Sequence, residues 1–391
     1  MDLPSVSEFT DRVWEEEIIP QLFDYIAIPN KSPLFDKDWE KHGYMEEATQ
    51  LIYRWCKGRK IKGLSVEIVR LEGRTPLIFM EIPAFACDDD GDTVLLYGHL
   101  DKQPEMVGWR KDLDPWKPVR EGNKLYGRGG ADDGYAAFAS LTALEAVHKF
   151  GGSHKRCVVI IEACEESGSV DLPYYVDYLK EKIGEVSLVV CLDSGAGDYE
   201  RLWSTTSLRG MCAGDLTVKV LTEGVHSGDA SGVVPSSMRI LRQILNRIED
   251  DVTGRVLVEE LYAEIPEERI KQASVVADIL GDEIFTAYPF HEDVCPMSSD
   301  LKELVLNRTW RPSVSYTGMG GFPALADAGN VLRPSSAFKL SFRLAPTADG
   351  SIAAKKLKEV LEANPPYGAI VTFNAEKSAN GWNAPALASW L

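Results

Sequence analysis

Two kinds of hydrophobic pattern alternate along the first half of the chain. Stretches with apolar residues every three to four positions predict amphipathic helices, and short runs of β-branched and aliphatic residues predict buried strands. Their alternation is typical of an α/β layer with a largely parallel central sheet. The predicted helices cover residues 6–27, 42–58, 133–149 and 172–183, and the predicted strands cover residues 64–70, 76–83, 93–99, 156–163 and 187–192.

The pattern changes after about residue 209. Strand-like and helical segments now follow in the order β-α-β-β-α-β, and a helical stretch near residues 255–310 interrupts them. This order predicts a second, smaller α+β domain of the ferredoxin-like type, inserted into the first. We therefore expect domains over residues 1–208 and 209–378. Residues 379–391 would begin a return to the first domain, at the start of a helix in GWNAPALASWL.

Composition narrows the class of protein. The 42 basic and 60 acidic residues give a formal net charge of −18, which disfavours nucleic acid as a partner. No segment approaches the roughly 18 consecutive apolar residues of a membrane span, and the N-terminal sequence lacks the features of a secretory signal. The seven cysteines include no CxxC pair, so we expect reduced thiols. These features favour a cytoplasmic protein that binds neither nucleic acid nor membrane.

Ionisable side chains follow three of the predicted strands at their carboxyl ends. His99 and Asp101 end one strand in VLLYGHLDKQPE, Glu165 and Glu166 follow the second, and Asp193 follows the third. In an open α/β sheet, ligands bind outside the carboxyl ends of the strands. We therefore expect these side chains to converge in one crevice.

A glycine-rich turn adds further carboxylates to this group. Asp132 and Asp133 stand in LYGRGGADDGYAAF, directly before a predicted helix. So many carboxylates around one imidazole would repel each other unless a cation lay between them. Imidazole and carboxylate without thiolate suit zinc, with manganese or cobalt as alternative occupants. The surplus of ligands favours two ions over one.

Each of these features also has an ordinary structural explanation. A histidine at a strand end is commonly a hydrogen-bonding residue, two adjacent glutamates are usually solvated, and GRGG can be only a tight turn. Their coincidence at the ends of neighbouring strands favours the metal site. HEDVC at residues 291–295 lacks the second histidine of a zincin helix, and no G-x-S-x-G esterase motif occurs.

Seven short segments together resemble a known family. They are LLYGHLDKQPE, LYGRGGADDG, IEACEESGS, CLDSGAG, SLRG, GVHSGDASG and SFRLAP. In this order and spacing the chain resembles the dinuclear zinc metallopeptidases, which include carnosinase, cytosolic nonspecific dipeptidase, aminoacylase, bacterial glutamate carboxypeptidases and succinyl-diaminopimelate desuccinylase. The resemblance covers nearly the whole chain and is strongest to the dipeptidase branch. It implies a catalytic domain of the zinc-peptidase type and a smaller lid and dimerisation domain.

The resemblance also implies a role for each residue at the strand ends. His99 and Asp193 would hold one zinc ion, Glu166 would help to hold the second, and Asp132 would bridge the two. Asp101 would fix the orientation of His99 through a hydrogen bond, as metal-ligating histidines require.

Further roles follow for Glu165 and for three residues of the smaller domain. Glu165 would be the general base. His226 would reach the active site of a partner subunit and polarise the scissile carbonyl, and Arg343 with Asn330 would bind the carboxylate end of the substrate. The resemblance therefore implies a homodimer joined through the smaller domain, with a dipeptide or N-acyl amino acid as substrate.

One departure from the family pattern concerns the end of the sequence. The family has a further metal-ligating histidine and a glycine-rich substrate-binding turn in its C-terminal return, and neither occurs before Leu391. We expect that the sequence is truncated. Two hypotheses stay open: a two-zinc hydrolase that cleaves the amide bond with Glu165 as base, or a noncatalytic metal- or peptide-binding homologue that lacks the C-terminal ligand.

Overall fold

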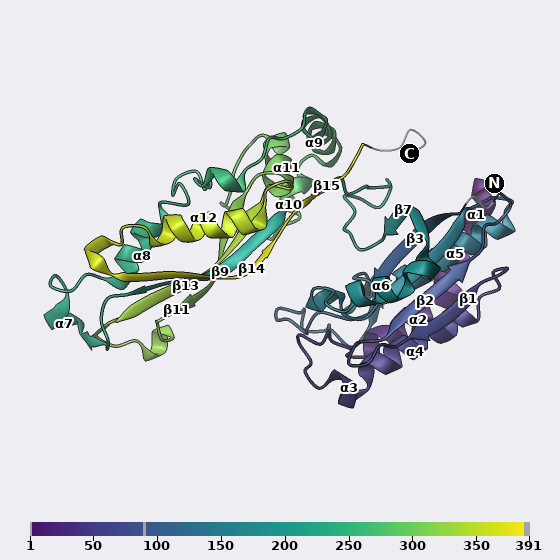
Figure 1. Ribbon diagram of the computed structural model, residues 1–391, viewed down its shortest axis with the longest axis horizontal. Coiled ribbons are helices and arrows are strands. Elements are labelled where there is room, and N and C mark those ends of the chain that lie inside the picture. The colour runs from purple at the N-terminus through teal and green to yellow at the C-terminus, as the bar shows by residue number, and fades with distance from the viewer. Residues whose placement is uncertain (1, 89–90, 387–391) are drawn as a thin grey trace. The chain divides into compact units, whose positions relative to one another are not determined.

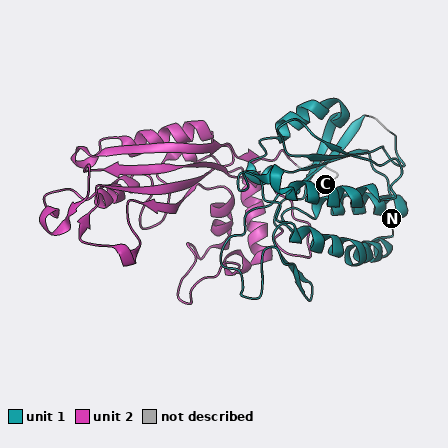
Figure 2. Ribbon diagram, turned by 90° about the horizontal axis from the view of Figure 1, so that it is seen from below, with its two compact units in different colours: residues 1–195 teal, residues 196–391 magenta. Residues whose placement is uncertain are grey.

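A computed structural model describes residues 2–88 and 91–386. The chain divides into two units, residues 1–195 and residues 196–391, which Figure 2 shows in different colours. Each unit has its own core of buried hydrophobic side chains. No helix among the described residues is long and apolar enough to cross a membrane. All seven cysteines are free thiols, which confirms the prediction from their spacing.

Five strands form the central sheet of the first unit (Figure 1). They are β1 (Ser65–Val69), β2 (Leu77–Ile82), β3 (Asp92–His99), β6 (Arg156–Glu162) and β7 (Glu185–Cys191). Their order across the sheet is β1-β2-β6-β3-β7. Each of the five lies where the hydrophobic pattern predicts a strand.

The sheet is mixed, so the prediction of a largely parallel sheet is wrong for its first two strands. β6, β3 and β7 run parallel, whereas β2 is antiparallel to both β1 and β6. A parallel connection needs a crossover of a dozen or more residues, and the connecting segments 70–76 and 83–91 are shorter than that. The three parallel strands nevertheless bring their carboxyl ends to one edge of the sheet.

Helices cover both faces of this sheet. Those of the first unit are α1 (Leu3–Val13), α2 (Ile19–Ala27), α3 (Trp39–His42), α4 (Tyr44–Lys57), α5 (Ala136–Lys149) and α6 (Leu172–Ile183). Alternate residues of β2 point to opposite faces of the sheet. Ile78 and Met80 pack in the cluster that holds α1, α2, α4 and α5. Leu77 and Phe79 pack under α6 on the other face. A small hairpin of β4 (Val119–Glu121) and β5 (Lys124–Tyr126) lies outside the sheet.

The helix predicted over residues 6–27 is interrupted by a π-helical turn, Trp14–Ile18, between α1 and α2. Pro20 stands at the start of α2 and has no backbone N–H to donate into the preceding turn. A single wider turn accommodates the missing hydrogen bond. The chain therefore stays helical through the proline.

A glycine lets the N-terminus of α5 press against the tip of β3. A Cβ atom on Gly98 would lie 2.4 Å from Cβ of Ala136 and 2.7 Å from Oδ2 of Asp133. Both distances are too short for real atoms, so any larger residue would push α5 and the turn before it away from His99.

Lys102 is fully buried and holds three segments together near the carboxyl ends of the parallel strands. Its Nζ donates to the carbonyl oxygens of Tyr25 at 2.6 Å and Ile28 at 2.7 Å, at the end of α2. Burial lowers the pKa of this amine well below its usual value. Its carbon stem fills the space beside Gly129, where a Cβ atom would lie 2.6 Å from Cε of Lys102. The lysine thus joins α2, the tip of β3 and the turn that carries Asp132.

The second unit is a four-stranded antiparallel sheet covered by two helices on one face (Figure 1). Its elements follow the predicted β-α-β-β-α-β order: β9 (Gly210–Lys219), α8 (Ser237–Leu245), β11 (Ser313–Gly320), β13 (Ser335–Leu344), α12 (Gly350–Glu362) and β14 (Ile370–Ala379). The order across the sheet is β11-β13-β9-β14. Leu216 and Val218 of β9 and Leu340 and Phe342 of β13 pack under α8 and α12. The odd-numbered residues of these strands lie on the uncovered face.

Short elements extend this unit. A helical insertion with its own small core consists of α9 (Glu267–Leu280), α10 (Glu283–Thr286) and α11 (Leu301–Thr309). Beside α7 (Ser227–Ala230), β10 (Val225–His226) pairs with β12 (Val331–Leu332), and β8 (Ser207–Leu208) pairs with β15 (Trp382–Asn383). The helix predicted after residue 379 is therefore a strand over Trp382–Asn383, since backbone pairing with β8 fixes these residues. The remainder of that helix, residues 387–391, lies outside the described residues.

Replacing Lys102 with methionine should destabilise the first unit. The change keeps most of the length of the side chain but removes the donor to the carbonyl oxygen of Ile28, whereas the oxygen of Tyr25 keeps the N–H of Ile28 at 3.1 Å. An unpaired buried group costs about 1–3 kcal/mol. We expect the free energy of unfolding, measured with urea, to fall by roughly 1–3 kcal/mol. Lys57→Met, at the exposed end of α4, is the control and should change it little. Equal effects of the two substitutions would contradict this role of Lys102.

Glu162, the last residue of β6, is a second buried ionisable group near the same edge. Its Oε1 accepts hydrogen bonds from the hydroxyls of Tyr97 at 2.7 Å and Ser169 at 2.9 Å. Its Oε2 is buried and has no hydrogen-bond partner among the described residues. Burial raises the pKa of Glu162 from 4.5 to about 7. The carboxyl group is therefore more stable in its protonated form in the folded protein.

This raised pKa predicts a pH dependence of stability. The contribution of Glu162 is complete below its unfolded pKa near 4.5 and is lost as the pH rises through its folded pKa near 7. Its size is on the order of 3 kcal/mol. In the metal-free protein, Glu162→Gln should therefore flatten the fall in unfolding free energy between pH 4.5 and about pH 8. Urea denaturation over a pH series checks this, and parallel curves for the two proteins would refute it.

Candidate metal centre

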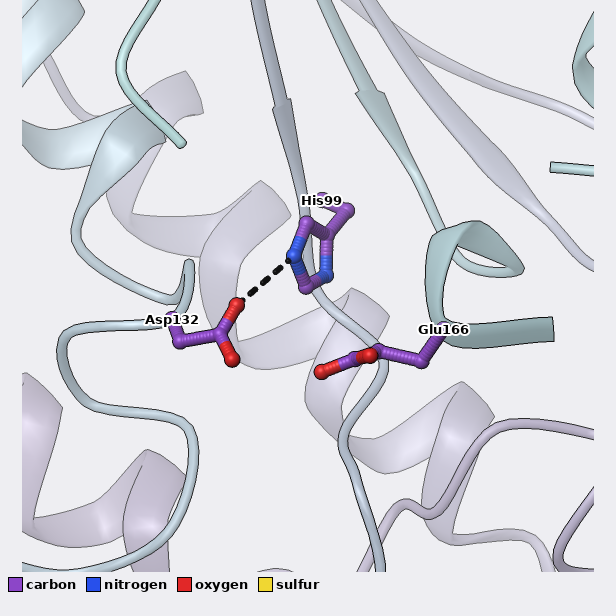
Figure 3. Close-up of side chains that lie close together, drawn as sticks. All are labelled: His99, Asp132 and Glu166. Atoms are coloured by element: carbon purple, nitrogen blue, oxygen red, sulfur yellow. Dashed lines mark hydrogen bonds and ion pairs between the residues drawn. The ribbon is translucent and has the colours of Figure 1, made fainter. Parts of the chain in front are cut away.

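The carboxyl ends of the three parallel strands bring the predicted ligands together. Two groups of possible metal ligands share His99: one with Asp132 and Glu166, the other with Glu165 and Asp193. Within each group the donor atoms all lie within 4.8 Å of one another. Figure 3 shows the first group, in which the His99 ring lies between the two carboxylates.

Nε2 of His99 is the centre of this cluster. It lies 3.2 Å from Oδ1 of Asp132, 3.7 Å from Oδ2 of Asp193 and 3.9 Å from Oε2 of Glu165. The ring is buried, whereas the surrounding carboxylates are partly exposed. The acidic groups thus surround the Nε2 edge of an imidazole that the strand holds in place.

Asp101 connects the tip of β3 to the turn after β6. Its two carboxylate oxygens accept the backbone N–H groups of Glu165 and Glu166, each at 3.0 Å. These glutamates begin a short 3₁₀ turn, Glu165–Ser167. On its other side, Asp101 has its Oδ1 3.5 Å and its backbone oxygen 3.0 Å from Nδ1 of His99. With Nδ1 facing these two oxygens, Nε2 is free to face the remaining carboxylates.

Two residues without a predicted role also contact the cluster. Asp133 is buried, and its Oδ2 accepts the backbone N–H of His99 at 3.2 Å. The side-chain amide of Gln103 donates to Oε2 of Glu166. Both stand next to predicted site residues in HLDKQP and GADDG, but the sequence does not show which way a side chain in a turn points.

The charges of the cluster shift the pKa values of its members. Burial alone lowers the pKa of His99, but hydrogen bonds and charges from Asp101, Asp132 and Asp133 outweigh it and raise the pKa to about 11. The hydrogen bond from His99 lowers the pKa of Asp132. The imidazole therefore acts as a cation among the acids when no metal is bound.

Four other carboxyl groups of the cluster have raised pKa values, in contrast to the lowered pKa of Asp132. Burial raises the pKa of Glu165 and of Asp193, and it raises the pKa of Asp133 and of Glu166 to about 7. Repulsion between neighbouring carboxylates adds to each of these shifts. Several acids held this close can all ionise only if positive charge is added between them.

The residues present fit a divalent metal ion. Oε1 of Glu166 and Oδ1 of Asp133 are buried and have no hydrogen-bond partner among the described residues. One imidazole and several carboxylates, without thiolate, form a ligand set that zinc and related ions accept. Asp132, Glu165, Glu166 and Asp193 offer oxygens for such a set, and His99 offers a nitrogen.

The three predicted residues of the second unit do not form one group. His226 ends β10, and Asn330 lies beside it, with its backbone oxygen accepting the N–H of Ser227 at 3.0 Å. Arg343 stands near the far end of β13, roughly 25–30 Å along the strand from its first residue, Ser335. One chain therefore cannot place Asn330 and Arg343 on the same substrate carboxylate, because they lie at opposite ends of one sheet.

The exposed imidazole of His226 has a defined tautomer. Its Nδ1 accepts the backbone N–H of Gly228 at 3.1 Å. In the neutral ring the proton must then lie on Nε2. His226 can therefore donate a hydrogen bond through Nε2 to an acceptor outside its own loop.

Comparison with known proteins gives concordant results. The mouse Beta-Ala-His dipeptidase is 28% identical over 298 residues, which cover 74% of this chain and 58% of the mouse protein. A Cysteinylglycine-S-conjugate dipeptidase of Corynebacterium striatum is 27% identical over 370 residues, 91% of this chain and 77% of the bacterial protein. The chain thus spans little more than half the length of some of its relatives.

Solved structures share the fold. The dipeptidase Dug1p of Saccharomyces cerevisiae has a TM-score of 0.71 at 22% identity, and human carnosine dipeptidase 1 has a TM-score of 0.71 at 23% identity. Each comparison covers 98% of this chain and 81% of the other. The model of the peptidase family M20/M25/M40 matches residues 95–336, which include every predicted ligand. Since the match covers more than half of the 391 residues, the chain belongs to peptidase family M20/M25/M40.

Proposed function

We propose that this protein is a metal-dependent hydrolase that cleaves the amide bond of dipeptides or N-acyl amino acids. The observation that carries the proposal is the convergence of His99 with four carboxylates, three that follow the parallel strands and Asp132 in the turn before α5. Membership of a peptidase family supports hydrolysis, and the relatives named as dipeptidases support a short peptide as substrate.

The proposed centre holds two zinc ions. His99 and Asp193 would bind one ion, Glu166 would help to bind the other, and Asp132 would lie between them. When bound, the metal would polarise the scissile carbonyl and lower the pKa of a water molecule. Asp101 and Gln103 would keep the ligands oriented, since they hold His99 and Glu166 through direct hydrogen bonds.

Glu165 is the proposed general base. Its backbone is fixed by Asp101, and its carboxylate lies beside the ligands, 3.9 Å from Nε2 of His99. Burial raises its pKa, which brings the carboxylate closer to the basicity that proton transfer at neutral pH needs. Glu165 would take a proton from the attacking water and pass it to the leaving amine. A noncatalytic metal-binding protein would not need this residue, so its position favours the hydrolase.

The second unit would complete the site across a homodimer. His226 would donate through Nε2 to the carbonyl oxygen of a substrate in the partner subunit, and Asn330 beside it would act in the same place. Arg343 would bind the substrate carboxylate. Arg343 lies near the end of β13 that is far from Asn330, which supports two different subunits as the places where they act. The second unit would then serve as lid and dimerisation domain.

The free thiols support a reducing compartment for this enzyme. Structural disulfides form in oxidising compartments and are rare in the cytosol. We therefore propose the cytoplasm as its location.

Glu165→Gln should separate catalysis from metal binding. The substitution keeps the shape of the side chain and removes the base, so turnover should fall by about 10²–10⁴-fold while bound metal persists. Asp132→Ala is the matched variant and should lose metal, because its carboxylate lies closest to Nε2 of His99. Elemental analysis and dipeptide hydrolysis measure both effects. Undiminished metal in Asp132→Ala would exclude Asp132 as the bridge.

His226 can be tested for action across subunits. If it stabilises the developing oxyanion, His226→Ala should lower kcat by about 10²–10³-fold with folding intact. Mixing this variant with Glu165→Gln should restore part of the activity, because one site of a mixed dimer then has both groups. Hydrolysis after subunit exchange, verified with differently tagged chains, is the measurement. No recovery despite exchange would place His226 at its own subunit's site or at none.

A further inference from the structure

Three arginines of the second unit gather at one end of its sheet. Arg343 lies on the face that α8 and α12 leave uncovered, where it pairs in register with Ser313 of β11 and Met211 of β9. Arg209 directly precedes β9, and Arg308 stands in the last turn of α11. The strand register and the end of α11 therefore place all three in the same region.

Hydrogen bonds of Arg209 fix this arrangement. Its Nη1 donates to the backbone oxygens of Asn307 at 3.1 Å and Arg311 at 3.2 Å, and to the hydroxyl of Ser313 at 3.2 Å. Because β13 lies between β9 and β11, the side chain must pass over the end of β13, where Arg343 stands, to reach Ser313. It ends at the C-terminus of α11, beside Arg308.

The charges of this cluster are not neutralised within the unit. Among the described residues, none of the three arginines has an ion pair with a carboxylate, whereas the nearby Arg311 binds Glu303 at 2.7 Å. Burial and then the charges of Arg343 and Arg308 lower the pKa of Arg209 to about 10. The hydrogen bonds to backbone oxygens at the end of α11 give Arg209 a structural role. The side chains of Arg308 and Arg343 have no hydrogen-bond acceptor among the described residues.

Such a cluster is unusual in a chain with 60 acidic and 42 basic residues, where carboxylates to pair with are abundant. Positive charges held close together repel one another, which costs free energy, and an anion bound between them removes that cost. Guanidinium groups bind carboxylates through two parallel hydrogen bonds, so two exposed arginines provide places for two carboxylates.

We propose that this cluster binds a dicarboxylate, and that the preferred substrates are dipeptides with an acidic C-terminal residue. Arg343 takes the terminal carboxylate, and Arg308 takes the carboxylate of the terminal side chain, next to the fixed charge of Arg209. The choice of substrate rests on the proposed peptidase function, whereas dicarboxylate binding by the second unit does not.

Arg308 can be tested as the determinant of this preference. The metal-loaded protein should hydrolyse Ala-Glu with a higher kcat/KM than Ala-Gln, and Arg308→Gln should lower that ratio by about tenfold, the effect of losing one charged hydrogen bond. Arg308→Lys keeps the charge and should retain most of the preference. Arg242→Gln on α8 removes an equally exposed arginine without an ion pair among the described residues, and should leave the ratio unchanged.

Calorimetric binding of succinate, with acetate for comparison, gives a readout that does not depend on catalysis. The unmodified protein should bind succinate more tightly than acetate, and Arg308→Gln and Arg343→Gln should each weaken succinate binding by about tenfold. If neither dipeptide is hydrolysed but these losses occur, the peptidase function fails and the dicarboxylate site stands. If Ala-Glu is not preferred and succinate binding is unchanged in both variants, the inference is wrong.

Discussion

The metal centre depends on one pair of hydrogen bonds, from the backbone of Glu165 and Glu166 to the carboxylate of Asp101. The contact links two strands that are neighbours in the sheet but far apart in the sequence. It fixes the turn that carries a proposed base and a proposed ligand, and the same residue turns His99 so that Nε2 faces the acids. The hydrogen bond from Gln103 to Glu166 joins the same two segments.

Holding many acids at one edge of a sheet requires support from the layers below. Gly98 lets α5 approach β3, and Lys102 fills the space under the turn of Asp132 while it caps the end of α2. Burial in this region also raises the pKa of Glu162 and of Asp133 to about 7. Ionisation of these buried carboxyl groups is therefore unfavourable unless positive charge is added, and we expect the stability of the first unit to depend on pH and on metal for the same reason.

The two units carry clusters of opposite charge. Acids gather at the strand tips of the first unit, whereas Arg209, Arg308 and Arg343 gather at one end of the second unit's sheet. A peptide has a polarisable amide carbonyl and an anionic carboxylate end. Under the proposed function, the metal centre would act on the carbonyl and the arginines would select the residue that follows it.

The sequence by itself determined the elements and the kinds of residue at their ends, because helical and strand periodicity are local properties. From three strand ends it predicted that His99, Glu165, Glu166 and Asp193 would converge in one crevice. Tertiary structure decided the antiparallel course of β2, the contact of Gln103 with Glu166, and the separation of Asn330 from Arg343. Strand pairing and side-chain direction in turns are set by atoms distant in the sequence, and no local pattern encodes them.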